Sequence, residues 1–351
     1  MNITCYLHHP GDLSSRSGMF PLAEALSASV VFYEGTWWKI QERSFRLGDW
    51  ARRWGQKVYG SEWNSLLPGW DERWIAARTQ DAQDVAHFLW GEFAAPIHPA
   101  RFRRKARLLV ATFHASSSRL PTILGNSRTL HNLDGITLMS EQQKSFFMEK
   151  GFPEKRIQTI LHGVDTTWFY PSDDSQAICG GRDALQGFMI GVTERDHAFL
   201  ADVMRSLPPG ILKLNVATSE AQRVHYHNIP GVEILPRLSD DELREQYRQS
   251  DLLMMPVMDC TANNSILESM ACGTPVMVNR IGGISEYVPE TANIVMPDKN
   301  VDDWVGRIHD LAAQRDQLII KRSKVRAWAE TLDWHLVARR YIEFYYRLGI
   351  N

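Results

Sequence analysis

Residues 259–286 read DCTANNSILESMACGTPVMVNRIGGISE, and the order of their expected elements indicates the fold class. An Asn-rich polar segment runs into a short helical pattern, which is followed by a turn of small residues, an apolar strand and a Gly-Gly turn. A helix that returns through a tight turn into an apolar strand is typical of α/β folds with parallel sheets. We expect Asn264 and Ser265 to cap a helix that runs to about Met270.

The same alternation of apolar runs and helical patterns extends over the chain, which at 351 residues is long for one hydrophobic core. The candidate strands cover residues 3–7, 30–33, 85–89, 108–113, 136–139 and 157–161, then 187–192, 212–216, 232–235, 252–256, 275–278 and 293–296. A polar, turn-rich stretch separates the two series. We therefore predict two doubly wound, Rossmann-like α/β domains facing a cleft, in which ligands sit beyond the carboxyl ends of the strands. The expected parts are a first domain at 1–170, a linker at 171–185 and a second domain at 186–330.

Composition excludes several classes of partner. The formal net charge of −2 gives no global field that would recruit nucleic acid or a membrane. The basic run RFRRKAR at 101–107 is interpreted as a solvated helix, so no nucleic acid is expected. The four cysteines lack CxxC spacing and fit reduced thiols. No signal peptide is indicated, and no apolar stretch approaches the ~20 residues of a membrane span. We expect a cytoplasmic protein, at most peripheral at the inner face of the membrane.

The predicted helix end suggests a ligand. A helix N-terminus offers unpaired backbone N–H groups and a partial positive charge, so it can bind phosphate. Glu268, one turn into the helix, cannot bind phosphate but can accept hydrogen bonds from a vicinal diol such as ribose. Together they suggest a nucleotide diphosphate. The alternative, a solvated Glu268 and a plain cap, stays open on these residues alone.

The segment NSILESMACGTPVMVNRIGGISEYV at 264–288 resembles the nucleotide-sugar motif of retaining GT-B glycosyltransferases, the glycogen-synthase-like "family 4" group. Residues 138–171 resemble the Ser-Glu helix and the crossover of that family, and 232–256 resemble the unit that seats the base. Residues 328–348 resemble its C-terminal helix. The resemblance covers about the last two-thirds of the chain.

This resemblance implies the GT-B fold, with a C-terminal helix at 331–351 that packs back on the first domain. It implies that Glu268 holds the ribose hydroxyls. The donor-binding residues that it implies in the second domain are Pro236, Arg237, Thr261, Asn263, Asn264, Ser265 and Glu268.

Two departures from the family pattern concern the sugar and the diphosphate. The family has a second Glu eight residues before the ribose Glu, where this chain has Cys260, or Asp259 after a one-residue shift. It also has a basic pair after the first strand of the second domain. Here Val192 stands in place of the Arg, which leaves Arg195 as the candidate to bind phosphate oxygens and stabilise the leaving group.

In the first domain, the stretch HHPGDLSSRSGMFPLAEAL at 8–26 stands where the family has a Gly-rich loop near the donor, and Ser17 and Gly18 match it loosely. It is not the GxGxxG fingerprint of dehydrogenases. His114 ends a strand where relatives often carry a His next to the reacting sugar. A lone His at a strand end is more often structural, but the resemblance favours a catalytic role.

The acceptor side is suggested by aromatic residues. Eight of the twelve tryptophans precede residue 91, and Leu47, Trp50, Trp54 and Val58 recur at helical spacing. One interpretation is a helix that packs on the sheet. The other is an acceptor or membrane surface that includes Trp50, Arg52 and Arg53.

No Asp-x-Asp and no zinc spacing occurs, so neither a metal nor another cofactor is expected. We predict a retaining, metal-independent glycosyltransferase that moves a sugar from a nucleotide diphosphate to a glycan or lipid-linked acceptor. The alternatives are a non-catalytic nucleotide-sugar-binding protein and another two-domain nucleotide-sugar enzyme such as an epimerase.

Overall fold

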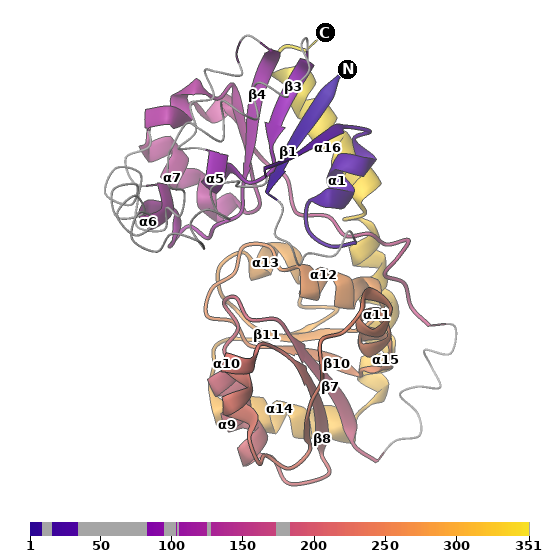
Figure 1. The fold of residues 1–351 in the computed structure, drawn as a ribbon. Coiled ribbons are helices and arrows are strands. Elements are labelled where there is room, and N and C mark those ends of the chain that lie inside the picture. The colour runs from indigo at the N-terminus through magenta and orange to yellow at the C-terminus, as the bar shows by residue number, and fades with distance from the viewer. Residues whose placement is uncertain are drawn as a thin grey trace, which may run out of the picture. The chain divides into compact units, whose positions relative to one another are not determined.

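The computed structural model describes residues 1–8, 16–33, 83–94, 103, 105–124, 128–172 and 183–350 (Figure 1). They pack into two compact units. One unit combines Met1–His162 with His335–Asn351, and the other is Gly163–Trp334. Among the described helices, none combines the length and the apolar content that a membrane crossing needs.

The first unit contains a six-stranded parallel sheet in the order β2-β1-β3-β4-β5-β6. Its strands are β1 (Ile3–His8), β2 (Ser29–Tyr33), β3 (Gln83–Phe88), β4 (Ala106–Phe113), β5 (Gly135–Leu138) and β6 (Ile157–Thr159). Its helices are α1 (Phe20–Ala25), α5 (Gly91–Ala94), α6 (Leu120–Leu124), α7 (Lys144–Glu149) and α16 (Trp334–Arg347). Short 3-10 turns lie at Arg128–Asn132, Glu141–Gln143 and Glu154–Arg156. Strands buried on both faces read as continuous apolar runs, which is why each expected strand overlaps an observed one.

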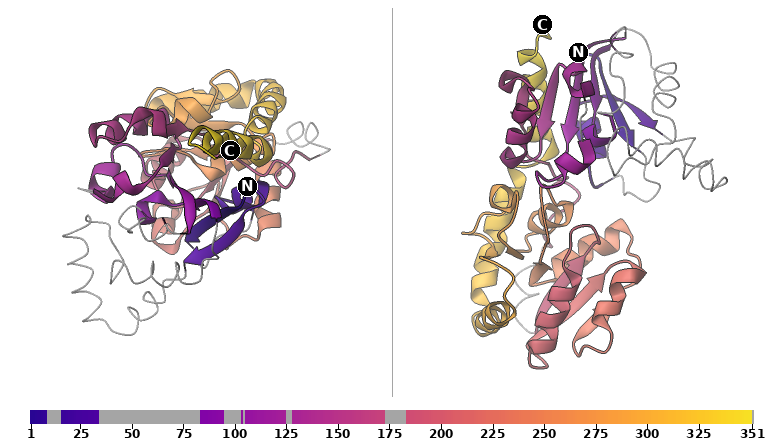
Figure 2. Two further views of the ribbon diagram at one scale, coloured as in Figure 1. Left: turned by 90° about the horizontal axis from the view of Figure 1, so that it is seen from above. Right: turned by 90° about the vertical axis from the view of Figure 1, so that its left-hand side faces the viewer.

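The C-terminal helix α16 packs on this first sheet, as Figure 2 shows in yellow. The hydroxyl of Tyr345 lies 2.7 Å from Nδ1 of the buried His87 in β3. A Cβ at Gly135 would fall 2.5 Å from Leu348 and 2.8 Å from Phe344. Glycine therefore allows α16 to lie directly on the start of β5.

The second unit also contains six parallel strands, in the order β12-β11-β10-β7-β8-β9. They are β7 (Leu185–Ile190), β8 (Leu212–Ala217), β9 (Val232–Ile234), β10 (Leu252–Met255), β11 (Val276–Asn279) and β12 (Ile294–Met296). The helices are α9 (His197–Ser206), α10 (Glu220–Arg223), α11 (Asp240–Gln249), α12 (Asn264–Ala271), α13 (Ile284–Tyr287), α14 (Val301–Ala313) and α15 (Asp316–Glu330), with a 3-10 turn at Val224–Tyr226. Both units are thus doubly wound sheets with flanking helices, which confirms the predicted fold class.

The order of strands reverses between β1 and β3 in the first unit and between β7 and β10 in the second. In doubly wound sheets, ligands bind beyond the carboxyl ends of the strands at such a switch point. We therefore expect ligands to bind at the loops that follow these four strands.

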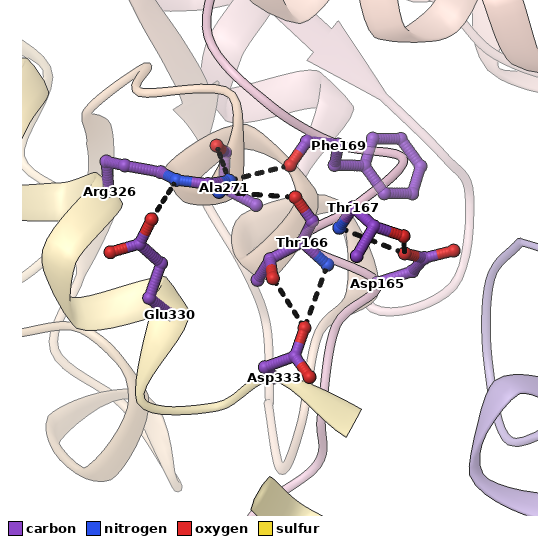
Figure 3. Close-up of polar contacts among 8 residues, drawn as sticks. All are labelled: Asp165, Thr166, Thr167, Phe169, Ala271, Arg326, Glu330 and Asp333. Carbon is purple, nitrogen blue, oxygen red and sulfur yellow. Dashed lines mark hydrogen bonds and ion pairs between the residues drawn. The ribbon is translucent and has the colours of Figure 1, made fainter. Parts of the chain in front are cut away.

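Arg326 of α15 forms hydrogen bonds with the backbone of the first residues of the second unit (Figure 3). Its Nη1 donates to the carbonyl oxygens of Phe169 and Ala271, each at 2.8 Å, and its Nη2 donates to that of Thr166 at 3.2 Å. Asp333 accepts hydrogen bonds from the backbone N–H and the hydroxyl of Thr166. These contacts attach Thr166 and Phe169 to the second unit, which begins at Gly163. The expected linker at 171–185 starts later in the chain and lies partly outside the described residues.

The expectation of a helix at 101–107 is wrong for the described residues of that run. Arg107 lies in β4 and approaches Asp84 at 3.6 Å, while Arg103 lies in the turn before β4 and pairs with Asp134 at 2.5 Å. The residues that follow Arg107 are buried on both faces of the sheet, and they draw this end of the run into β4.

Candidate functional site

At the switch point of the second unit, the loop after β7 pairs with the loop after β10. The N–H of Asp196, after β7, donates to the carbonyl of Pro256, after β10, at 2.9 Å. The N–H of Met258 donates back to the carbonyl of Glu194 at 2.9 Å. This pairing brings the loop that carries Arg195 against the segment that leads into α12.

The helix α12 is capped by Asn263, whose Oδ1 accepts from the N–H of Ile266 at 3.4 Å. The expectation that Asn264 and Ser265 cap the helix is wrong by one to two residues. Asn264 is the first helical residue, and Ser265 is buried in the first turn. Asn263 has the extended backbone that an N-cap requires, with φ −136° and ψ 109°.

Arg195 is tied to this helix end by its guanidinium. Its Nη2 donates to Oδ1 of Asn263 at 3.1 Å and lies 3.3 Å from Oγ of Ser265. Its Nη1 donates to the carbonyl of Thr193 at 2.6 Å, and its Nε donates to that of Ile190 at 3.3 Å. The sequence-predicted Arg195, Asn263 and Ser265 therefore form one hydrogen-bonded cluster.

Gly191 makes room for this guanidinium. Its φ is +99°, and a Cβ there would lie 2.9 Å from Nε of Arg195. Burial lowers the pKa of Arg195, while Cys260, Tyr247 and Glu268 act in the opposite direction. Because an arginine keeps its proton in proteins, Arg195 places a fixed positive charge at the N-terminus of α12.

Glu268 is buried, with 5% of its surface exposed, so the alternative of a solvated helix residue is wrong. Its Oε2 accepts a hydrogen bond from the hydroxyl of Tyr247 in α11 at 2.9 Å. Burial, and next the charge of Glu268, raise the pKa of Tyr247 well above its usual value, so this hydroxyl stays protonated and acts as the donor. Tyr247 was not among the predicted site residues.

The remaining predicted donor residues are spread more widely. Thr261 is buried between β10 and α12, whereas Pro236 and Arg237 are exposed in the loop after the edge strand β9. In the first unit, Ser17 and Gly18 lie between β1 and α1, and Gly18 is buried with φ +72°.

His114 lies at the carboxyl end of β4 in the first unit. Its Nε2–H donates to the carbonyl of Leu89 at 2.7 Å, and its ring stacks on Trp90 with centroids 4.0 Å apart. Burial lowers the pKa of His114 to about 4, so the ring is neutral at pH 7 with Nδ1 as its acceptor nitrogen. The backbone N–H of His114 donates to Glu92, a second residue that was not predicted.

The suggested acceptor residues Trp50, Arg52 and Arg53 lie outside the described residues. Within the described ranges, no three His, Cys, Asp or Glu side chains come together in a way that could hold a metal ion.

A protein-family model described as "Glycosyl transferases group 1" matches residues 192–314, which begin beside the Arg195 loop and include all of α12. Residues 192–314 form a glycosyl transferase group 1 domain.

Relatives of this chain with curated names are transferases. A D-inositol 3-phosphate glycosyltransferase of Rhodococcus opacus is 26% identical over 242 residues, which are 60% of this chain and 52% of that protein. The sulfoquinovosyl transferase SQD2 of Arabidopsis thaliana is 28% identical over 223 residues, 59% of this chain and 43% of that protein. The chain thus spans about half the length of these relatives.

Solved structures resemble the chain over nearly its full length. The sucrose-phosphate synthase of Thermosynechococcus elongatus has a TM-score of 0.73 at 14% identity and covers 99% of this chain and 98% of its own. Anabaena HepE, in complex with UDP and glucose, has a TM-score of 0.67 at 14% identity, with 98% of both chains covered. These likenesses confirm the predicted GT-B fold.

The group 1 domain departs from the expected pattern at Cys260. This residue is buried, and its Sγ lies 3.5 Å from the carbonyl of Thr261. Burial raises the pKa of the Cys260 thiol to about 12, so no thiolate stands in for the usual carboxylate. The neighbouring Asp259 is half-buried, and its Oδ1 would lie 3.0 Å from a Cβ at Gly282.

Val192 is the other departure in the group 1 domain, and its side chain is 42% exposed. In the loop after β7, Arg195 is the cation that contacts the start of α12. His197 follows in α9 and donates from Nε2 to the carbonyl of Gly191 at 2.9 Å. Burial lowers the pKa of His197, which favours its neutral form. Of the expected basic pair, Arg195 remains as the candidate, and its hydrogen bonds hold the loop after β7 against the start of α12.

Proposed function

We propose that this protein is a glycosyltransferase that moves a sugar from a nucleotide diphosphate to a glycan or lipid-linked acceptor. The observation that carries the proposal is the cluster of Arg195, the N-terminus of α12 and the buried Glu268, located at the switch point of a group 1 domain. A cation and a helix N-terminus suit a diphosphate, and a carboxylate one turn further suits a diol.

In this proposal, Glu268 receives the ribose hydroxyls, and Thr261, Asn263, Asn264 and Ser265 surround the diphosphate. Pro236 and Arg237 contribute to the seat of the base, and Ser17 and Gly18 are the donor-binding residues that we propose in the first unit. UDP is the first nucleotide to test, because the similar HepE structure was solved with UDP and glucose.

Charge on the leaving diphosphate would be stabilised by Arg195 and by backbone amides, which is electrostatic catalysis without a metal. The lack of an Asp-x-Asp motif supports this proposal. The resemblance to retaining enzymes supports transfer with retention, in which the acceptor attacks from the face that the diphosphate leaves. His114 would lie next to the reacting sugar as a neutral hydrogen-bonding ring.

For the acceptor, we propose that part of the tryptophan-rich segment, including Trp50, Arg52 and Arg53, provides the contact, with a peripheral membrane contact if the acceptor is lipid-linked. The names of the relatives, one acting on D-inositol 3-phosphate, support a hydroxyl acceptor of small polar or glycan type. Cys5, Cys260 and Cys272 are free and buried, which supports a cytoplasmic location.

Two experiments test the proposal. The first is a thermal-shift screen of the purified chain against UDP, GDP and ADP, since a ligand at 100 times its Kd stabilises the native state by about 2.7 kcal/mol. The second measures transfer from the matching labelled nucleotide sugar, with and without EDTA. Transfer that survives EDTA supports the proposal, whereas loss that manganese restores would contradict the metal-independent mechanism.

The alternatives predict other results in the same experiments. Binding without transfer to any acceptor would favour a nucleotide-sugar-binding protein, for which Cys260 and Val192 are the motivating residues. Conversion of the donor without an acceptor would favour an epimerase-type enzyme. The absence of any nucleotide-induced stabilisation would contradict all three.

A further inference from the structure

Glu92 links the carboxyl ends of the neighbouring strands β3 and β4, next to the switch point of the first unit. It lies in α5, directly after β3, and its Oε1 accepts hydrogen bonds from the backbone N–H groups of His114 and of Ala115, the latter at 2.6 Å. These two N–H groups follow β4. One carboxylate oxygen therefore holds the turn that carries His114.

The turn that contains Glu92 also holds the imidazole ring. The carbonyl of Leu89 accepts from Nε2–H of His114, and Trp90 stacks on the ring with an interplanar angle of 19°. Residues 89–92 thus fix His114 by its backbone, by one ring nitrogen and by one ring face.

The buried carboxyl group of Glu92 lowers the stability of the fold. Only 7% of the residue is exposed, and Oε2 is buried without a hydrogen-bond partner. A buried polar atom without a partner is rare in native proteins and reduces their stability. A neutral acceptor such as a glutamine oxygen could hold the same two N–H groups, so the backbone alone does not require a carboxyl group here.

We propose that Glu92 is a positioning residue of the transfer reaction, which acts through His114 and whose ionisation sets how firmly the His114 turn is held. This inference rests on the proposed function, in which His114 lies next to the reacting sugar.

The titration of Glu92 falls in the physiological range. Burial raises the pKa of Glu92 to about 7, against the opposing effect of the backbone hydrogen bonds and of Arg119. The other titratable groups nearby are His114, His87 in β3 and His162, whose ring centroid lies 6.4 Å from that of His114. Burial lowers the pKa of His87 to about 3 and that of His114 to about 4, so neither of these two changes charge near pH 7.

The direction of the effect follows from the hydrogen bonds. Above pH 7 the ionised carboxylate makes charge-assisted bonds to both N–H groups, and these are roughly twice as strong as neutral ones. Below pH 7 the protonated group holds them less firmly. The kcat should therefore fall as the pH decreases through about 7, with little change in the Michaelis constant for the donor.

The kinetic test is Glu92→Gln, which keeps the acceptor oxygen but cannot ionise. The variant should show a kcat about threefold to tenfold below the wild-type plateau, and this kcat should not change around pH 7. Glu24→Gln, on an exposed residue of α1, is the matched control and should keep the wild-type profile. A Glu92→Gln enzyme with the wild-type kcat, or with a lower kcat that keeps the wild-type pH dependence, would overturn the inference.

A second measurement needs neither turnover nor a variant of Glu92. In the 15N-histidine NMR spectrum of the wild-type chain, the His114 ring, assigned by its loss in His114→Gln, should shift with an inflection near pH 7. His114 resonances that stay constant through this range would overturn the inference even if Glu92→Gln fails to fold. An inflection in a protein that binds no nucleotide would instead support the link between Glu92 and His114 and contradict the proposed function.

Discussion

The hydroxyl of Tyr247 donates a hydrogen bond to Oε2 of Glu268 across 2.9 Å, and both side chains are buried. The bond joins α11 to α12 and sets the orientation of the carboxylate to which we assign the ribose. Tyr247→Phe should therefore lower UDP affinity about fivefold to tenfold and reduce the free energy of unfolding by ~1–3 kcal/mol. Calorimetry and denaturant unfolding measure the two effects.

Tyr345→Phe is the matched control for this variant. It removes another buried tyrosine hydroxyl, next to His87 in the first unit. It should cost stability without a loss of UDP affinity. If Tyr247→Phe bound UDP as tightly as Tyr345→Phe does, Tyr247 would support only the fold and not the nucleotide site.

Glu268→Gln should weaken nucleotide binding while it keeps the shape and an acceptor for Tyr247. A hydrogen bond to a charged group contributes about 1.5–3 kcal/mol, so UDP affinity should fall at least tenfold. The comparison with 2′,3′-dideoxy-UDP isolates the ribose: the wild type should prefer UDP, and the variant should not. A variant that still prefers UDP by the wild-type factor would rule out the ribose role.

Arg195→Ala should lower kcat by about 10² and change donor affinity less, because charge on the leaving diphosphate grows towards the transition state. Steady-state kinetics with saturating acceptor separates the two parameters. Arg205→Ala, an exposed arginine of α9, is the control and should leave both unchanged. If only the Michaelis constant for the donor rises, Arg195 merely positions the substrate.

Gly191→Ala should disturb Arg195 as well as the backbone. At φ +99° a non-glycine residue costs roughly 1–2 kcal/mol, and the new Cβ would also press on the Arg195 guanidinium. Gly210→Ala has a similar φ of +90° with no atom within 4 Å of its Cβ, so it reports the backbone cost alone. We expect thermal unfolding to show a larger loss for Gly191→Ala, with weaker UDP binding in that variant only. Identical behaviour of the two variants would mean that Arg195 adapts without cost.

The strands were predictable where they form short, mainly apolar runs, and most clearly in β10 and β11, whose residues are all buried. The order of the strands was not predictable, because nothing in the sequence of a run such as 252–255 indicates that it pairs with 187–188. The cap of α12 was predicted one to two residues too late because the polar residues Asn263, Asn264 and Ser265 follow one another, and only the backbone dihedrals select the first.

A local motif was enough to propose Glu268 as a candidate site residue, whereas contacts that depend on topology could not be read from the sequence. Tyr247 is the one buried residue of the mainly polar helix α11, and its partner lies 21 residues away. Glu92 reaches His114 only because β3 and β4 are adjacent in the sheet. Neither relation has a spacing that the sequence alone reveals.

The return of α16 to the first sheet has a consequence for how the protein is made. The second unit is continuous in sequence, whereas the first requires His335–Asn351 to be complete. On the ribosome, chains emerge from the N-terminus and domains generally fold as they appear. Here Tyr345, the partner of His87, emerges after the whole second unit, so the domain that begins first should be finished last. A released chain that ends at residue 334 should resist protease in the second unit and remain open to cleavage in the first. Until release, the exposed face of the first sheet is where a chaperone would bind.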